Sequence, residues 1–186
     1  MVKPLFVHIP KNGGTSIRQA LYDQWPIYND GLTNFVNGHW TQYQLESRAR
    51  HAQYDYDYLF CDIREPLRRA KSVISHIKTK FIQQHGNHPY SKSSDDELVE
   101  QLFGYSEYRQ KNNFDFHYLL LHQKSYIGNK NMIIYNMNNL KQLENDLKIT
   151  IPHVNQTMSS DVKLSTSSIR TIENYFDVDF TLWESL

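Results

Sequence analysis

The stretch His8-Ile9-Pro10-Lys11-Asn12-Gly13-Gly14-Thr15-Ser16-Ile17 decides the fold, because it joins an apolar strand to a helix through a glycine turn. The run Leu5–Ile9 predicts a buried strand, and Thr15–Gln24 predicts a helix. Backbone N–H groups at a helix N-terminus have no intrahelical partner, and the helix dipole adds positive charge there. Glycines let that backbone approach a phosphate closely. The stretch therefore predicts an anion-binding loop, with Lys11 and the hydroxyls of Thr15 and Ser16 as further donors.

Two other interpretations of this loop stay open. It is also compatible with a tight strand-to-helix turn in which Thr15 or Ser16 caps the helix, since Gly-Gly turns are common. A nucleotide-triphosphatase loop is the other alternative, but it needs the pattern G-x-x-x-x-G-K-[ST], with lysine after the glycines. Here Lys11 precedes Gly13 and Gly14, which disfavours that alternative without excluding it.

A second basic element follows the next strand. The run Tyr58–Ile63 predicts a strand, and Pro66 at a first helical position opens a helix toward Phe81. Arg64 at the strand end offers a planar fork that suits bidentate phosphate binding. Arg69 and Ser72 lie three residues apart and share a helix face. The alternative is an amphipathic helix whose arginines are merely solvated.

The rest of the chain alternates helices and strands. We expect a short extended piece at 34–38, helices at 42–50, 95–103, 115–124, 140–147 and 167–176, and a strand at 132–135. The Ser94-x-x-Glu97 spacing is that of a capping box. Alternation of this kind predicts one α/β domain over residues 1–186, a three-layer fold with a mostly parallel central sheet flanked by helices.

Composition excludes several classes of protein. The chain has 186 residues, with 20 Lys+Arg balanced by 20 Asp+Glu, so we expect no nucleic acid partner. Its one cysteine, Cys61, cannot form an intrachain disulfide and is expected to be a buried, inert thiol. No apolar stretch approaches the roughly 18 residues of a spanning helix, and none precedes the first strand as a signal peptide would. We therefore expect a cytoplasmic protein without a membrane partner.

The two basic elements resemble those of the carbohydrate sulfotransferase family that uses 3′-phosphoadenosine 5′-phosphosulfate (PAPS), including the heparan sulfate 2-O-like enzymes. The run from His8 to Ile17 is similar to the family's 5′-phosphosulfate loop, H-I-P-K-T-G-G-T-S, with Asn12 in place of threonine. Arg64, Pro66, Arg69 and Ser72 match its R-x-P-x-x-R-x-x-S element for the 3′-phosphate, and 153–157 resembles its late H-x-N-x-S/T loop. The resemblance implies a P-loop-like fold and these cofactor-binding residues: Lys11, Asn12, Gly13, Gly14, Thr15, Ser16, Arg64, Arg69, Ser72 and Asn155.

The same resemblance implies a reaction in which a sulfuryl group moves from PAPS to a hydroxyl, here of a carbohydrate, leaving 3′-phosphoadenosine 5′-phosphate (PAP). Lys11 is expected to stabilise charge on the leaving phosphate, and no metal is expected. Histidine suits the general base near neutral pH. His39, in Asn37-Gly38-His39-Trp40, resembles the family's base-bearing Gly-His element, and His8 is its rival. A P-loop kinase or hydrolase, and a noncatalytic nucleotide-binding protein, are the alternative functions.

Overall fold

A computed structural model describes residues 2–25, 38–81, 89–104, 117–128, 131–152 and 161–186. These residues divide into two compact units. The first comprises residues 1–64 and 122–155 together with 186, and the second comprises 65–121 and 156–185. The chain thus leaves the first unit after Arg64 and returns to it at His122. Each unit has a core of its own and is described separately below.

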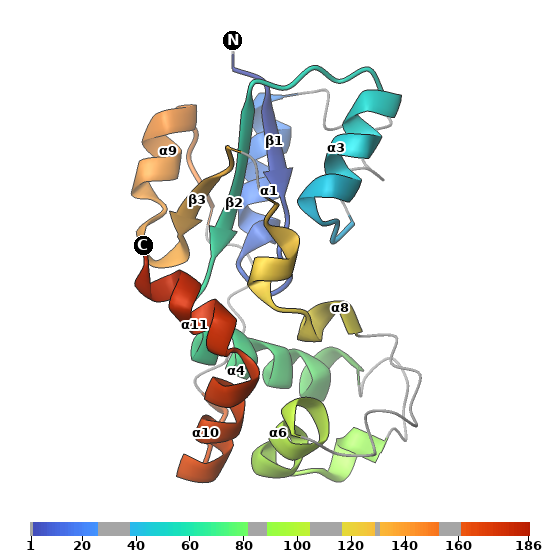
Figure 1. The fold of residues 1–186 in the computed structure, drawn as a ribbon, viewed down its shortest axis with the longest axis vertical. Helices are drawn as coiled ribbons and strands as arrows, with labels where there is room; N and C mark the ends of the chain where they lie inside the picture. Colours follow the sequence, from blue (N-terminus) through green and yellow to red (C-terminus); the bar gives the residue numbers. More distant parts are fainter. Residues whose placement is uncertain (1, 26–37, 82–88, 105–116, 129–130, 153–160) are drawn as a thin grey trace. The chain divides into compact units, whose positions relative to one another are not determined.

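The first unit contains a three-stranded parallel sheet in the order β1-β2-β3, with β1 at Pro4–Val7, β2 at Tyr58–Ile63 and β3 at Ile133–Asn136 (Figure 1). The central strand β2 is buried over Leu59–Ile63 and reads as a nearly continuous apolar run, as expected for a parallel strand covered on both faces. The predicted α/β class with a parallel sheet and flanking helices is confirmed.

Three helices accompany this sheet: α1 at Gly14–Gln24, α3 at Gln42–His51 and α9 at Lys141–Leu147 (Figure 1). Two short 3₁₀ turns, Gln123–Tyr126 and Met137–Asn139, lie between them in the sequence. All three helices fall within one residue of the predicted bounds. The strand β1 ends at Val7, two residues before the predicted end, although His8 and Ile9 are also buried.

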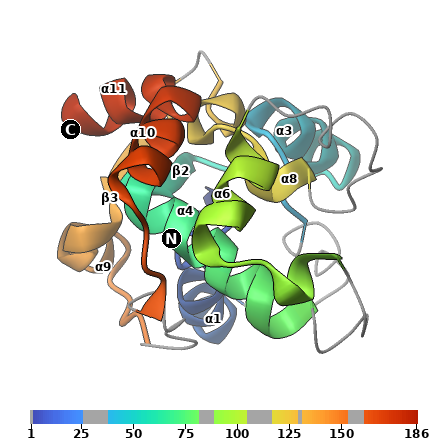
Figure 2. The same cartoon turned by 90° about the horizontal axis from the view of Figure 1, so that it is seen from below.

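The second unit is helical. It consists of α4 at Pro66–His76 with a π-helical turn at Ile77–Phe81, a 3₁₀ turn at Pro89–Lys92, α6 at Asp95–Phe103, α8 at His117–Leu120, α10 at Thr166–Tyr175 and α11 at Asp177–Glu184. Figure 2 shows α4, α6 and α10 from a second side. Their apolar faces form one core that includes Val73, Leu102 and Phe176. The helix α11 was not predicted: the expected last helix ended at Phe176, and a further helix follows it.

Side-chain caps explain where two helices of this unit begin. The Glu65 carboxylate accepts hydrogen bonds from the backbone N–H groups of Leu67, at 3.0 Å, and Arg68, at 2.8 Å, with Pro66 at the first helical position. Ser94 and Glu97 form the predicted capping box at the start of α6. Such caps contribute about 1 kcal/mol each by pairing amides that the helix leaves without partners.

Two further properties follow from the fold. Cys61 is a free, buried cysteine in β2, and burial raises its thiol pKa well above the ordinary value, which matches the expected inert thiol. Among the residues that the structure describes, no helix combines the length and the apolar composition that crossing a bilayer would demand.

Candidate anion-binding site

The turn between β1 and α1 has the backbone of an anion-binding loop. Lys11, at φ 68°, and Gly13, at φ 87°, both adopt the left-handed conformation, and α1 begins at Gly14. Because the residue preceding the helix is a glycine, it has no side-chain oxygen with which to cap the first amides of α1. A Cβ on Gly13 would lie 2.6 Å from Cε of Met137, which follows β3. The loop therefore lies against the end of another strand, and only glycine fits its conformation and its surroundings.

Asn12 turns its side chain inward from this loop. The residue is completely buried, and its Nδ2 donates to the backbone oxygen of Asp62, at 2.8 Å, and to Oε1 of Gln123, at 2.7 Å. A residue held in this way presents only its backbone to a ligand. The identity of residue 12 is thus explained by packing beneath the loop.

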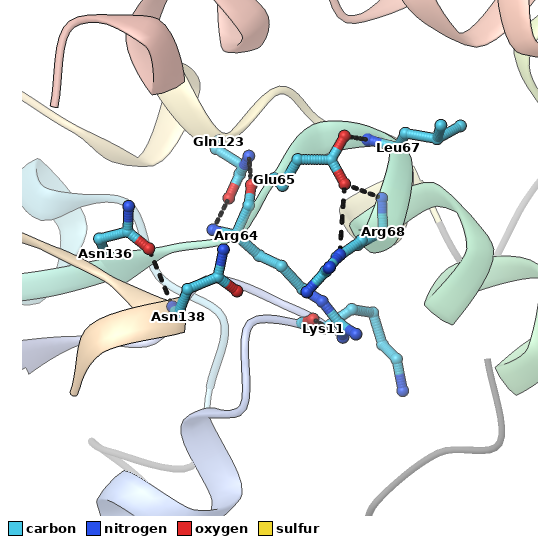
Figure 3. A network of polar contacts seen from close by, with 8 residues as sticks. All are labelled: Lys11, Arg64, Glu65, Leu67, Arg68, Gln123, Asn136 and Asn138. Atoms are coloured by element: carbon cyan, nitrogen blue, oxygen red, sulfur yellow. Dashed lines mark hydrogen bonds and ion pairs between the residues drawn. The ribbon is translucent and has the colours of Figure 1, made fainter. Parts of the chain in front are cut away.

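Arg64 lies beside the same loop. Its Nη1 donates to the backbone oxygen of Lys11, at 3.2 Å, and Gln123 pairs with both its backbone N–H and its backbone oxygen, at 2.9 and 2.8 Å. Figure 3 shows the three residues together. The loop after β1 and the residue after β2 are therefore neighbours at the carboxyl edge of the sheet, where ligands of open parallel sheets bind.

His8 packs beneath the start of α1. A Cβ on Gly14 would overlap Cδ2 and Nε2 of the His8 ring, so the imidazole occupies the space that any other residue at position 14 would need. Burial, together with the charges of His39, Arg18 and Lys11, holds the pKa of His8 well below its ordinary value. His8 is therefore a neutral imidazole at neutral pH.

His39 contacts His8 in two ways. The ring centroids lie 4.5 Å apart, and Nδ1 of His39 is 3.3 Å from the backbone oxygen of His8. Because a carbonyl oxygen only accepts hydrogen bonds, this contact requires a proton on Nδ1, and in the neutral imidazole the lone pair then lies on Nε2. The residue after His39 is Trp40, and the Arg48 guanidinium lies 3.8 Å from the centroid of its ring.

Asp62 is an unexpected feature of this unit. It is fully buried in β2, and neither carboxylate oxygen has a hydrogen-bond partner among the described residues. Burial raises its pKa well above the ordinary value, although its own backbone N–H and the charge of Arg64 act in the opposite direction. Burial therefore favours the neutral acid of Asp62 over its carboxylate.

Replacing Asp62 by asparagine is expected to stabilise the protein at neutral pH. The unfolded carboxyl loses its proton near pH 4, whereas the folded one keeps it, so the folded state holds more protons and its stability falls as pH rises. Asparagine removes this cost. We expect a gain of at least about 1 kcal/mol at pH 7.5, or about 2–4 °C in a chain of this size.

Thermal unfolding of both proteins between pH 4 and pH 8 tests this expectation. The gain should shrink as pH falls toward 4, where the unfolded carboxyl is protonated too. Asp55→Asn, at an exposed position of the same unit, is the control and should show no such gain. A difference between wild type and Asp62→Asn that does not change with pH would contradict the assignment of Asp62 as a neutral acid.

Three predicted site residues are not among the described residues of the first unit. Arg69 and Ser72 belong to the second unit, where both are buried in α4. The Arg69 Nη2 donates to the backbone oxygen of Leu119, at 3.1 Å, and its guanidinium lies 5.4 Å from the centroid of the Phe176 ring. Asn155 falls outside the described residues. A role for these three residues in phosphate binding stays a prediction.

Sequence reasoning missed Gln123. It lies in a polar segment with no recognisable motif, 59 residues beyond Arg64. A side chain whose partners are backbone groups far away in the chain leaves no periodic signal. As to metals, no group of three or more His, Cys, Asp or Glu side chains placed to hold an ion occurs within the described ranges.

The chain was also compared with protein-family models, with curated proteins and with solved structures, and none of the three comparisons yields a match.

Proposed function

We propose that this protein is a P-loop-like, PAPS-dependent sulfotransferase that transfers a sulfuryl group to a hydroxyl, on a carbohydrate as the resemblance implies. The observation that carries the proposal is the bond from the Arg64 guanidinium to the Lys11 backbone oxygen. It joins a glycine loop suited to one phosphate with an arginine suited to another. A cofactor with a phosphate at each end of its ribose matches a site with two such elements.

The residues present fit this cofactor. The backbone amides of Gly13, Gly14 and Thr15, at the start of α1, together with the Lys11 side chain, would hold the 5′-phosphosulfate, whereas the Ser16 N–H already donates to the Gly13 carbonyl, at 3.0 Å. Arg64 would hold the 3′-phosphate, and the sequence resemblance adds Arg69, Ser72 and Asn155. When bound, PAPS supplies the sulfuryl group and a phosphate as leaving group. Lys11 and the loop amides would stabilise the negative charge that grows on that phosphate.

His39 is the proposed general base. Its Nδ1 is committed to the His8 carbonyl, so its Nε2 can accept the proton of an acceptor hydroxyl. His8 is less suited to this role, because its ring is buried against Gly14 and its low pKa makes it a weak base. His8 instead provides the carbonyl that fixes the tautomer of His39.

Selective stabilisation by PAP is the test of this proposal. A ligand that binds only the folded state raises its stability by RT ln(1 + [L]/Kd), about 2.7 kcal/mol at a hundredfold excess over Kd. We expect clear stabilisation by PAP, less by ADP and by adenosine 5′-phosphosulfate, which lack the 3′-phosphate, and no requirement for magnesium. Stabilisation by ATP with magnesium alone would overturn the proposal in favour of a kinase or hydrolase.

A pair of arginine variants sharpens the test. Arg64→Gln should remove most of the advantage of PAP over ADP, because a bidentate cationic contact to phosphate is lost. Arg68→Gln is the matched control, since Arg68 lies four residues further along with its side chain 65% exposed and paired only loosely with Glu65, at 3.9 Å. If both substitutions reduce the preference for PAP over ADP equally, that preference arises from positive charge in general and not from a specific contact of Arg64.

A further inference from the structure

The 3₁₀ turn Gln123–Tyr126 carries a side chain that contacts both parts of the candidate site. Gln123 is completely buried, with 0% of its surface exposed. Its Oε1 accepts from Asn12 Nδ2, at 2.7 Å, and from the backbone N–H of Arg64, at 2.9 Å. Its Nε2 donates to the backbone oxygen of Arg64, at 2.8 Å. One side-chain amide thus pairs with the loop that follows β1 and with the residue that follows β2. Figure 3 shows the pairing of Gln123 with Arg64.

The pairing with Arg64 fixes the backbone of that residue. The Gln123 amide replaces a neighbouring strand, because it pairs with the N–H and the C=O of the same residue in the way that a sheet partner would. Arg64 lies just beyond the last residue of β2, where the ladder of the sheet has ended. Without Gln123, the backbone N–H and C=O of Arg64 would lose these two hydrogen bonds, and the backbone that carries the Arg64 side chain would no longer be fixed by them.

The pairing with Asn12 fixes the loop. Asn12 lies between Lys11 and Gly13, which both adopt the left-handed conformation. A non-glycine residue such as Lys11 persists in that conformation only where its surroundings determine it. The Nδ2 of Asn12 has two protons, and both are engaged, one by Gln123 and the other by the Asp62 backbone. Asn12 therefore connects the loop to the end of β2, which Arg64 directly follows.

We propose that Gln123 is a positioning residue that sets the spacing between the glycine loop and the Arg64 guanidinium, so that one ligand is bound through two phosphates at once. This inference rests on the proposed function, since it takes PAP as that ligand. Two contacts to one ligand reinforce each other only when their spacing matches the ligand. We therefore expect Gln123 to affect the gain in affinity from binding both phosphates at once more than the affinity for either phosphate alone.

This gain in affinity is measured as a ratio of dissociation constants. AMP has the 5′-phosphate alone and PAP has both phosphates, so Kd(AMP)/Kd(PAP) reports how much the 3′-phosphate adds. Isothermal titration gives both constants for the wild type and for Gln123→Met, which keeps the length of the side chain but not its hydrogen bonds. We expect the ratio to fall at least tenfold in Gln123→Met, with a smaller change in the Kd of AMP.

A matched control separates positioning from stability. Leu143→Ala removes a buried side chain of α9 in the same unit, away from the network, and should lower stability while leaving the ratio as in the wild type. Gln123→Glu is a second variant in case Gln123→Met does not fold. It keeps the acceptor for Asn12 and for the Arg64 N–H but loses the donor to the Arg64 carbonyl, and its ratio should also fall.

The outcomes distinguish the two proposals. A wild-type protein that binds PAP no better than AMP overturns the proposed function, and the role of Gln123 with it. A wild type that prefers PAP, together with a folded Gln123 variant of unchanged ratio, overturns the positioning role alone. A ratio that falls as far in Leu143→Ala as in Gln123→Met also overturns it, because stability would then explain the effect.

Discussion

Replacing His39 by alanine is expected to lower the rate of sulfuryl transfer by about 10²–10⁴-fold, the usual contribution of a general base, while leaving the affinity for PAP nearly unchanged. The reason is the division of roles within the first unit. In the proposed site the loop amides, Lys11 and Arg64 bind the phosphates, whereas His39, whose Nδ1 contacts the His8 carbonyl, is proposed to act on the acceptor hydroxyl. Transfer from PAPS to a panel of sugar hydroxyls, measured beside PAP titration, gives both quantities.

Rescue by imidazole makes this experiment specific. Added imidazole can supply the missing lone pair in His39→Ala, so transfer should recover in proportion to the unprotonated imidazole present. His51→Ala is the control, because His51 is an exposed histidine at the end of α3 whose Nδ1 contacts only the Ser47 backbone, at 2.9 Å. Full activity in His39→Ala would exclude His39 as the base. A parallel loss of PAP affinity would make it a structural residue.

The sequence was sufficient to predict most helices and strands of the first unit, because these elements depend on local patterns. The strands β1 and β2 are mostly apolar runs, and Gly13 supplies a left-handed residue in the turn between β1 and α1. In the second unit, the capping box at Ser94 was predictable because it depends on two side chains three residues apart. Local signals of this kind depend on neighbours in the chain, so a pattern search detects them.

The division into two units was not readable, because it depends on contacts between distant segments. The segment from Glu65 to Leu121 packs with the helices after residue 160 to form a separate core, although the sequence shows no change of composition at either boundary. The helix α11 was missed for a related reason. Its start at Asp177 follows α10 almost without a break, so the acidic residues there read as the end of one helix.

The candidate site was predictable only in its local parts. Lys11, Gly13 and Arg64 were found because each belongs to a motif that follows a strand. The Asn12 side chain joins the loop to Asp62 and Gln123, a structural role that its place in the motif did not indicate. Asn12 and Gln123 are 111 residues apart, and their pairing depends on the register of a sheet that brings the ends of β1 and β2 together. No local pattern encodes such a pair.

Gly14→Ala is expected to destabilise the protein by about 1–3 kcal/mol, the usual cost of overpacking a filled interior, and removal of the His8 ring is expected to abolish most of this cost. Gly14 does not adopt the left-handed conformation, so alanine suits its backbone. The obstacle is the buried His8 imidazole, which a new Cβ would overlap. A ring packed against His39 and buried on every side has little room to move away.

The free energy of unfolding is measured with heat or denaturant for four proteins: wild type, Gly14→Ala, His8→Ala and the double variant. Gly14→Ala should cost much less in the His8→Ala background, with a coupling energy of about 1–3 kcal/mol, within the range for residues in contact. Gly13→Ala is the matched control. Its backbone is left-handed, at φ 87°, so it should be destabilising in both backgrounds alike. Additive costs of Gly14→Ala and His8→Ala would mean that the His8 ring does not lie beneath the start of α1.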